Sequence, residues 1–243
     1  MVLVFYMSDL RGMMRFLRNT PFHPQWLSVG RADVRNWIIG EARGYVLDVG
    51  CADQWVAKHL PSGCTYLGID NLDSGEALYG ARPSLFADAG HLPFADESID
   101  TIVMLEVLEH VRDPQQVMRE MARVLRPQGR ALITMPFLYP VHDAPYDFQR
   151  YTIYGHAREA ALAGLTVQEI KPRLGSAETA GLLASIVLGG AVYEAIRNRH
   201  PMLVFSPFML ALIPLINVIF WLVGRLFPSW ENATMGYRIA LSK

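Results

Sequence analysis

The stretch Val46-Leu47-Asp48-Val49-Gly50-Cys51-Ala52-Asp53-Gln54 decides how we interpret this chain of 243 residues. The run from Tyr45 to Val49 is apolar apart from Asp48, which is typical of a strand buried on both faces of a parallel sheet. Gly50 can adopt a positive φ and lets backbone N–H groups approach a ligand closely. We therefore predict a strand, a ligand-binding loop, and a helix that begins near Gln54 with its N-terminus directed at the ligand.

The loop lacks the glycines that a dinucleotide would need. A dinucleotide-binding loop would have glycine at positions 50, 52 and 55, but this chain has Gly50, Ala52 and Trp55, and the indole would block the pyrophosphate. Asp48 would also repel a pyrophosphate and favour a cationic ligand. S-Adenosylmethionine (SAM) is such a ligand, because it carries a sulfonium and an ammonium group. A nicotinamide-dependent oxidoreductase is the weaker alternative, since the chain also lacks a Tyr-x-x-x-Lys pair.

The stretch resembles the first motif of class I SAM-dependent methyltransferases of the type 11 family, which reads hydrophobic-x-Asp-hydrophobic-Gly-Cys-Gly. The resemblance covers about residues 44–172 and the last ten residues, with Ala52 in place of the usual glycine. It implies an α/β fold, namely a doubly wound, Rossmann-like sheet of seven mostly parallel strands, and SAM as the cofactor. The loop residues that it implies for cofactor binding are Asp48, Gly50, Cys51 and Ala52.

Two later strand ends add cofactor-binding candidates. Asp70 ends a second predicted strand, 20 residues past Gly50, where an acidic side chain can accept both ribose hydroxyls. The resemblance implies that Asp88 accepts from the adenine amino group while the Ala89 N–H donates to the ring. The alternative for Asp88 is an Asx turn that opens a surface loop.

The strand predicted over 99–105 leads directly into the next candidates. In similar methyltransferases, the residues after this strand line the methionine arm of SAM, which implicates Leu105 and Glu106. The Glu106 carboxylate could stabilise the sulfonium. We expect His110 to form a local hydrogen bond that holds the loop, although a catalytic role is the alternative.

The acceptor side is predicted over 136–152, after a strand at 131–135. This loop is rich in His, Asp, Tyr and Arg, and it follows a strand end, where transfer chemistry can be arranged. Either His142 or Asp143 could take the acceptor proton. Arg150 could instead pair with Asp143 or Asp147 and fix the loop. The loop is similar to that of methyltransferases with glycan, lipid or secondary-metabolite acceptors, which implies substrate binding by Tyr146, Arg150 and Tyr151.

Composition excludes other classes of function. A net charge of -1 gives no support to a nucleic-acid-binding surface. The seven histidines include no HExxH motif and no Cys/His cluster with ligand spacing, so we expect no metal. Hydrophobic residues make up 51% of the chain and the mean hydropathy is +0.18, which indicates that some apolar surface faces lipid or a partner.

That apolar surface is expected near the C-terminus. We divide the chain into an N-terminal amphipathic segment (1–29), a methyltransferase core (30–175), an apolar helical insert (176–230) and a last core strand (231–243) that lies antiparallel at the sheet edge. Two runs of the insert, 179–193 and 201–224, are uncharged. We expect prolines to break the second run into pieces of about a dozen residues that dip into one leaflet of a membrane. The alternative is a helical hairpin buried in a homodimer interface or covering the acceptor pocket.

The sequence thus predicts a SAM-dependent methyltransferase on the inner, cytoplasmic face of a membrane, attached peripherally or monotopically. The acceptor would be a small molecule, a glycan or a lipid-linked molecule, and the methylated atom an oxygen rather than nitrogen or carbon. The competing hypothesis is a SAM-binding scaffold of a membrane assembly that has lost turnover. Ala52 is its only support in the sequence.

Overall fold

The computed structural model describes residues 15–28, 32–72, 75, 80 and 82–243. The chain forms two compact units. The sheet unit comprises Ala32–Phe137, Val141–Lys171 and Gly236–Lys243, and the hairpin unit comprises Met1–Arg31, Leu138–Pro140 and Pro172–Met235. The first half of the predicted N-terminal amphipathic segment (1–29) lies outside the described residues.

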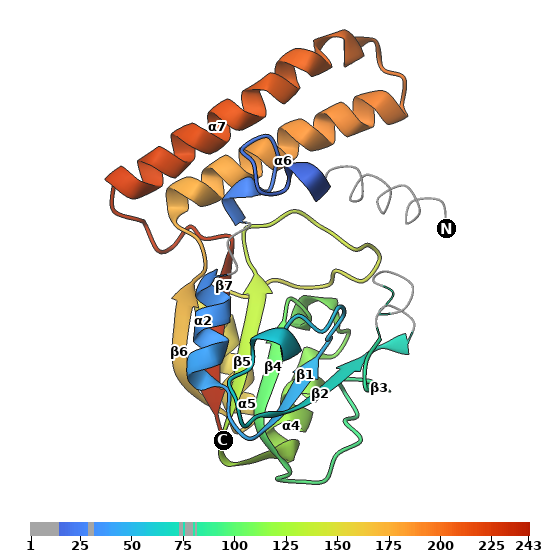
Figure 1. The fold of residues 1–243 in the computed structure, drawn as a ribbon, viewed down its shortest axis with the longest axis vertical. Coiled ribbons are helices and arrows are strands. Elements are labelled where there is room, and N and C mark those ends of the chain that lie inside the picture. Colours follow the sequence, from blue (N-terminus) through green and yellow to red (C-terminus); the bar gives the residue numbers. More distant parts are fainter. Residues whose placement is uncertain (1–14, 29–31, 73–74, 76–79, 81) are drawn as a thin grey trace. The chain divides into compact units, whose positions relative to one another are not determined.

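A seven-stranded sheet forms the centre of the sheet unit, in the order β3-β2-β1-β4-β5-β7-β6 (Figure 1). The four pairings among β1 to β5 are parallel, and β7 pairs with β5 in antiparallel fashion. This confirms the predicted doubly wound, mostly parallel sheet. The strands are β1 (Tyr45–Val49), β2 (Thr65–Asp70), β3 (Leu85–Phe86), β4 (Ile99–Leu105), β5 (Leu125–Pro136), β6 (Thr166–Pro172) and β7 (Gly236–Ser242).

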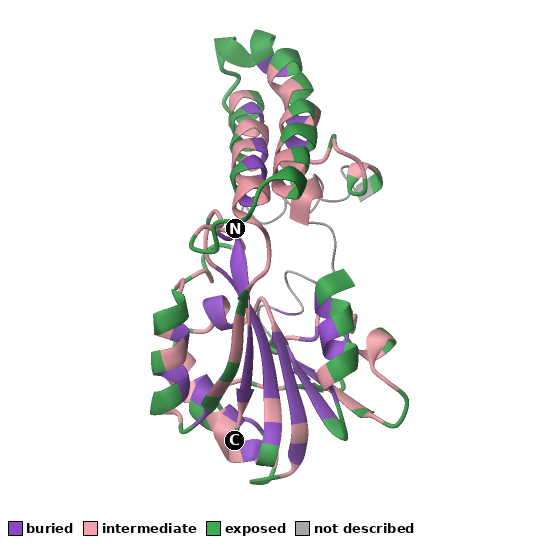
Figure 2. Cartoon of the chain, turned by 90° about the vertical axis from the view of Figure 1, so that its left-hand side faces the viewer, coloured by how far each residue is buried: buried purple, intermediate pink, exposed green. Residues whose placement is uncertain are grey.

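Helices cover both faces of this sheet (Figures 1 and 2). On one face α2 (Ala32–Glu41) buries Val34, Trp37 and Ile38 in a cluster with the strands. On the other face, α4 (Pro114–Val124) and α5 (Ile153–Leu162) pack on a larger cluster. α4 and α5 are both capped, because the side chains of Asp113 and Thr152 accept from backbone N–H groups of the first turn.

Three details of the sheet unit differ from the predictions. β7 lies between β5 and β6 rather than at the edge, and β6 is the edge strand, because β7 pairs with β5 along the whole of 236–242. β5 begins at Leu125 rather than at the predicted residue 131, because Leu125 already pairs with Ile99 of β4. The α-helix predicted to begin near Gln54 is absent. The described residues 54–60 instead form turns and the short 3-10 helix Ala57–His59.

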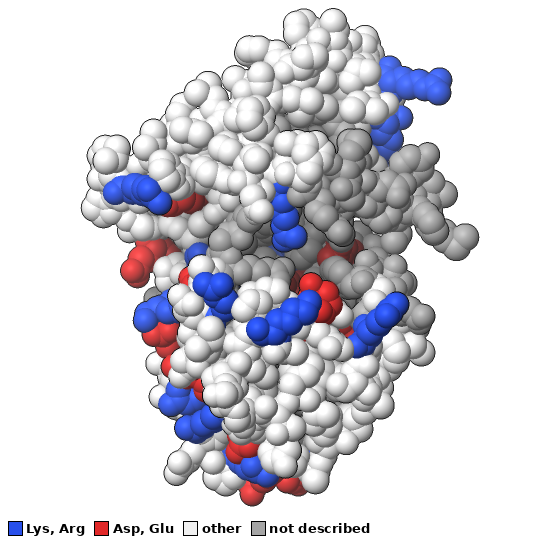
Figure 3. Space-filling model, in the orientation of Figure 1, with Lys and Arg blue, Asp and Glu red and all other residues white. Residues whose placement is uncertain are grey.

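The hairpin unit contains two long antiparallel helices, α6 (Ser176–Arg197) and α7 (Ser206–Leu226), joined through a short 3-10 helix at Pro201–Phe205 (Figure 1). Contrary to our prediction, α7 runs unbroken through Pro214. Both helical segments are long and apolar enough to cross a membrane by length and composition, with mean hydropathies of 1.6 and 2.3. The face that Figure 3 draws is almost free of charged side chains between the ends of the helices.

The two helices contact each other through small and polar residues. A Cβ on Gly181 would collide with Phe220, so this glycine permits the close approach of α6 and α7. The Ser185 hydroxyl donates to the Asn217 side-chain oxygen at 3.0 Å, and the Asn217 amide donates to the carbonyls of Pro21 and His23. The N-terminal segment therefore packs on the hairpin, and the polar groups of Asn217 are satisfied inside the unit.

Candidate active site

The loop after β1 is held against the end of β2. The N–H groups of Gly50 and Cys51 both donate to the Ile69 carbonyl, at 2.9 and 3.0 Å. Gly50 has φ 73°, and a Cβ there would collide with Val107, so glycine is required on both counts. Ala52 and Gln54 also have positive φ, 41° and 56°. This left-handed backbone winds the chain into turns, which is why no α-helix begins at Gln54.

Asp48 lies in the sheet beneath this loop. Its side chain is buried, and the Tyr66 hydroxyl donates to it at 2.9 Å. Burial raises the pKa of Asp48 to about 7, because desolvation and the charge of Asp70 outweigh the hydrogen bond from Tyr66. Beside it, burial raises the pKa of the Cys51 thiol to about 12. Asp48 is thus partly uncharged and Cys51 uncharged at neutral pH.

The raised pKa of Asp48 predicts how stability depends on pH in the absence of SAM. The folded state holds a proton on Asp48 up to about pH 7, whereas the unfolded chain releases it near the ordinary value of 3.8. The free energy of unfolding should therefore fall between about pH 4 and pH 7, by about 4 kcal/mol from this group. Urea unfolding of Asp48→Asn should lack this fall, whereas the exposed control Asp53→Asn should keep it. An Asp48→Asn protein with the wild-type pH dependence would contradict the assignment.

Asp70 connects the loop to the end of β2. Its two carboxylate oxygens accept from the N–H groups of Ala52, at 2.8 Å, and Asn71, at 2.9 Å. Burial raises the pKa of Asp70, although these two hydrogen bonds oppose the shift. The carboxylate thus lies directly beside the glycine loop at the carboxyl end of the strand, where a ribose would be held. Its role in binding ribose stays a prediction.

Asp88 and Ala89 follow β3. The exposed Asp88 carboxylate accepts from the Gly90 N–H at 2.8 Å, which is the Asx turn that we weighed, and its other oxygen lies 3.6 Å from His91 Nδ1. Ala89 packs against the core cluster. The Asx turn and an adenine contact are compatible, because a carboxylate has two oxygens that can accept.

Leu105 and Glu106 follow at the end of β4. Glu106 has φ 55°, a conformation that costs a non-glycine residue about 1–3 kcal/mol and that occurs often at functional sites. Its N–H donates to the Thr134 carbonyl at 3.0 Å, so the neighbouring strand β5 fixes the strained residue.

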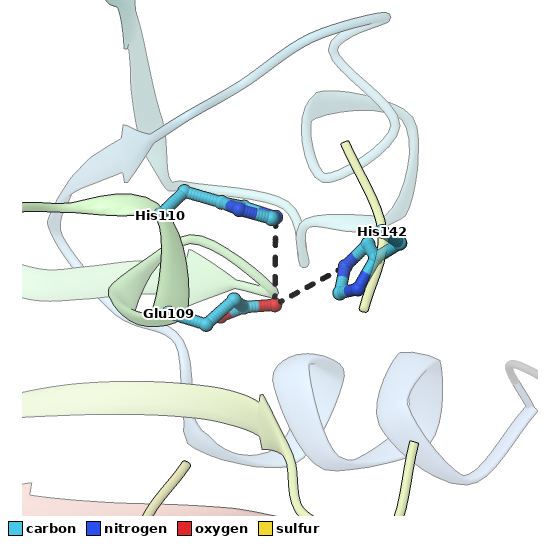
Figure 4. Close-up of side chains that lie close together, drawn as sticks. All are labelled: Glu109, His110 and His142. Carbon is cyan, nitrogen blue, oxygen red and sulfur yellow. Dashed lines mark ion pairs between the residues drawn. The ribbon is translucent and has the colours of Figure 1, made fainter. Parts of the chain in front are cut away.

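Three side chains from two loops form a cluster beside the end of β4 (Figure 4). Glu109 and His110 lie on the 3-10 helix Leu108–His110 after β4, and His142 lies on the loop after β5. His110 Nε2 is 3.7 Å and His142 Nε2 is 3.9 Å from the same oxygen, Glu109 Oε1. Because β4 and β5 are adjacent and parallel, their carboxyl ends bring these two segments together.

Glu109 is the unusual member of this cluster. Its side chain is 0% exposed, and among the described residues no donor forms a hydrogen bond with either carboxylate oxygen. Burial, and then the charge of Glu106, hold the pKa of Glu109 well above its ordinary range. Burial also lowers the pKa of His110, whose Nδ1 lies 2.8 Å from the Tyr146 carbonyl. Because a carbonyl only accepts, Nδ1 carries the proton and Nε2 faces Glu109 as an acceptor.

The loop after β5 is tied to this turn. The Gln149 amide donates to the carbonyls of Leu108 and Val111, and the Phe148 N–H donates to the Glu109 carbonyl at 2.9 Å. His110 does form a hydrogen bond that holds a loop, but its partner is the Tyr146 carbonyl, 36 residues along the chain, rather than a local group as expected. These contacts make the loop a fixed wall above the end of β4.

Asp147 and Arg150 orient His142. Arg150 forms a two-pronged ion pair with Asp147, so Asp147 rather than Asp143 is its carboxylate partner. Asp147 Oδ2 also accepts from the His142 N–H at 2.9 Å and lies 3.3 Å from His142 Nδ1. Burial would raise the pKa of Asp147, but the Arg150 guanidinium and these His142 contacts hold it below its ordinary value.

The other predicted acceptor-side residues lie around this cluster. Asp143 has φ 50° and its carbonyl accepts from the Tyr146 N–H. Tyr151 packs edge to face on His156 at the start of α5, with ring centroids 5.5 Å apart. The structure thus assembles His142, Tyr146 and Arg150 with Asp147, which was expected as one of two possible partners of Arg150, and with Glu109, which the sequence did not single out.

Comparison with known proteins identifies the class. Residues 47–133 match the family model described as a methyltransferase domain. A solved structure described as a SAM-dependent methyltransferase from Archaeoglobus fulgidus shares the fold, with a TM-score of 0.53 at 14% identity over 89% of this chain and 94% of that chain.

Curated relatives are methyltransferases as well. Methyltransferase GfsG from Streptomyces halstedii is 42% identical over 36% of this chain and 36% of its own length. O-methyltransferase resE from Aspergillus sclerotiorum is 35% identical over 37% and 38%, and the ubiquinone/menaquinone biosynthesis C-methyltransferase UbiE from Haemophilus ducreyi is 32% identical over 50% and 45%. The chain therefore spans between a third and a half of the length of these relatives.

The sheet unit is a Rossmann-like domain of the class I methyltransferase type, and SAM is the cofactor of this class. The chain carries a class I SAM-dependent methyltransferase domain.

Proposed function

We propose that this chain transfers the methyl group of SAM to an oxygen of a small, glycan or lipid-linked acceptor at the inner face of a membrane. The observation that carries the proposal is the convergence of four features at one edge of the sheet: the Gly50 loop, Asp70, the strained Glu106, and the cluster of Glu109, His110 and His142. The first three suit a cofactor with a ribose and a sulfonium. The cluster lies where a methyl acceptor would meet the sulfonium.

An oxygen acceptor requires the chemistry that this cluster offers. A hydroxyl must lose its proton as its oxygen attacks the methyl carbon, and imidazoles near neutral pH can assist that loss. The relative from Aspergillus sclerotiorum is named an O-methyltransferase, which supports an oxygen acceptor. The relative from Haemophilus ducreyi is named a C-methyltransferase, which makes a carbon acceptor the alternative. Incubation with SAM carrying a ¹³C-labelled methyl group and with lipid and glycan extracts, followed by NMR of the product, tests the choice. A labelled N-methyl or C-methyl signal would contradict it.

His142 should matter for turnover more than for cofactor binding. Its imidazole lies 3.9 Å from Glu109 in the cluster, after β5, whereas the ribose and adenine candidates follow β2 and β3. His142→Ala should lower kcat by on the order of 10²-fold, with little change in the affinity for SAM. Single-turnover kinetics and calorimetry measure the two effects separately. Full turnover in the variant would reduce His142 to a structural residue.

The hairpin unit supports the membrane part of the proposal. The charged residues of α6 and α7 lie only in their first and last turns, so the central turns of both helices are uncharged. Large apolar side chains are exposed along α6 and α7 and on the 3-10 helix Pro201–Phe205 that joins them, namely Val187, Ile196, Met202, Leu203, Val204, Phe205, Phe208, Leu210, Leu215, Val218, Ile219, Leu222 and Leu226. Such a surface suits lipid, and a hairpin returns to the side that it left, which keeps β6 and β7 together.

A further inference from the structure

The cluster of Glu109, His110 and His142 has a feature that proton transfer alone does not require. The Glu109 carboxylate is completely buried, and among the described residues nothing donates a hydrogen bond to it. A buried carboxylate without donors is costly unless it is neutralised or coordinates a cation. The two atoms nearest to it in the cluster are imidazole nitrogens, which are also ligand atoms.

The geometry of the cluster fits a metal centre. One ligand atom from each of the three residues lies within 4.8 Å of the other two. Ligands bound at about 2.1 Å are about 3.0–3.4 Å apart, so the separations of 3.7 and 3.9 Å from Glu109 need a contraction of less than 1 Å. The ligand atoms of the two histidines lie within 4.8 Å of each other and need a contraction of at most about 1.8 Å. Three protein ligands leave a coordination position open, as in catalytic zinc sites with two histidines and a glutamate.

Both imidazoles are oriented as metal ligands usually are. A ligating histidine typically directs its other nitrogen to a carbonyl or a carboxylate, which fixes the tautomer and the ring. His110 Nδ1 lies 2.8 Å from the Tyr146 carbonyl, and His142 Nδ1 lies 3.3 Å from the Asp147 carboxylate. Arg150 in turn holds Asp147 in place. In each ring, Nε2 is the atom directed at Glu109 (Figure 4).

We propose that Glu109, His110 and His142 bind a divalent transition-metal cation, with Zn²⁺ the best match, whose open position takes the oxygen of the methyl acceptor. The sequence predicts no metal because its histidines form no motif of ligands close together in the chain, whereas this set of ligands joins two loops. The assignment of the open position rests on the proposed function, but the metal site itself does not.

The cation would change how the acceptor loses its proton. A hydroxyl bound to a divalent cation becomes more acidic, as bound water does, so its proton can leave to solvent. The resulting oxygen then attacks the methyl carbon, a C–O bond forms, the C–S bond breaks, and the electron pair stays on sulfur as S-adenosylhomocysteine. No electron is gained or lost by the metal. His142 then acts as a ligand instead of a base.

Metal binding can be measured without SAM or acceptor. The full chain, stripped with a chelator, should bind one Zn²⁺ per chain in calorimetry, more tightly than Mg²⁺. Co²⁺ in its place should give visible absorption bands that report nitrogen and oxygen ligands. Glu109→Gln and His110→Ala should each lower the affinity for Zn²⁺ by more than about 100-fold, and Asp147→Asn by about 10–100-fold. His91→Ala, which removes an exposed imidazole, should leave it unchanged.

Two results would overturn the inference. One is the absence of stoichiometric binding of Zn²⁺, Mn²⁺ or Mg²⁺ to the folded wild-type chain. The other is the retention of wild-type affinity in Glu109→Gln and His110→Ala proteins that fold, as judged by circular dichroism and SAM binding. Methyl transfer by the metal-free protein would reject the assignment of the acceptor to the open position of the metal and keep the proposed function. Tight metal binding without transfer to any acceptor would keep the site and reject that function.

Discussion

We expect the purified protein to float with liposomes in a density gradient and to remain with them in high salt. The exposed side chains of α6 and α7 carry this expectation, because they are large, apolar and gathered on one unit of the chain. Transfer of about ten such side chains into lipid at about 1.5 kcal/mol each would favour attachment by roughly 15 kcal/mol. Loss of a few surface ion pairs in salt cannot reverse an energy of that size. Detergent should release the protein.

Matched substitutions distinguish insertion of the hairpin into lipid from nonspecific adsorption of the protein to liposomes. Leu215→Asp and Ile219→Asp place charges on the exposed surface of α7, and each should oppose insertion by about 2.5–3.5 kcal/mol if the position lies near the bilayer centre. Leu162→Asp, on the exposed surface of α5 in the sheet unit, should leave flotation unchanged. A monodisperse wild-type dimer that stays at the bottom of the gradient without detergent would contradict lipid attachment. It would favour a second copy of the chain as the partner of the hairpin.

We expect Asp70→Ala to bind SAM at least about 100-fold more weakly than the wild type. The Asp70 carboxylate lies beside the Gly50 loop and would accept both ribose hydroxyls, each in a charge-assisted bond of about 1.5–3 kcal/mol. The substitution also leaves the Ala52 and Asn71 N–H groups without their acceptor, so some stability should be lost too. Calorimetry with protein shown to be folded measures the affinity.

Asp53→Ala is the control for this experiment. It removes an exposed carboxylate from the same loop and should leave the affinity for SAM unchanged. Unchanged affinity in a folded Asp70→Ala protein would remove Asp70 from the ribose site, and with it the interpretation of the loop. Equal losses in both variants would point to net charge rather than to a specific contact.

Most of the sheet could be predicted because its strands are encoded locally. Buried parallel strands need mostly apolar segments, and the segments 45–49, 65–70 and 99–105, each interrupted by only one or two polar residues, form strands with the expected bounds. The order of the edge could not be predicted, because whether β7 or β6 forms it depends on pairing across the whole sheet. The unbroken α7 was missed for a similar reason. Its buried residues, such as Ile213 and Asn217, pack on α6 and keep Pro214 within one helix.

The candidate site shows the same division between local and distant information. Asp70 and the Gly50 loop could be selected because spacing along one chain segment places them together. Glu109 could not, since its importance arises from its approach to His142 on another loop, more than 30 residues away in sequence. Asp147 was expected only as an alternative partner of Arg150, and its second contact, with His142 in the same loop, follows from the fold of that loop. The available hint was the pair Glu109–His110 directly after a strand end, beside a second strand end with another histidine.

The most direct test of the account is the fate of the methyl group. SAM labelled with deuterium in the methyl group would be incubated with the protein and with lipid and glycan extracts, and mass spectrometry would follow both products. We predict a molecule that has gained an intact labelled methyl group, formed together with an equal amount of S-adenosylhomocysteine, and absent with Asp70→Ala. Tight binding of SAM with neither product, across all extracts and with metal supplied, would contradict the account and indicate a SAM-binding scaffold.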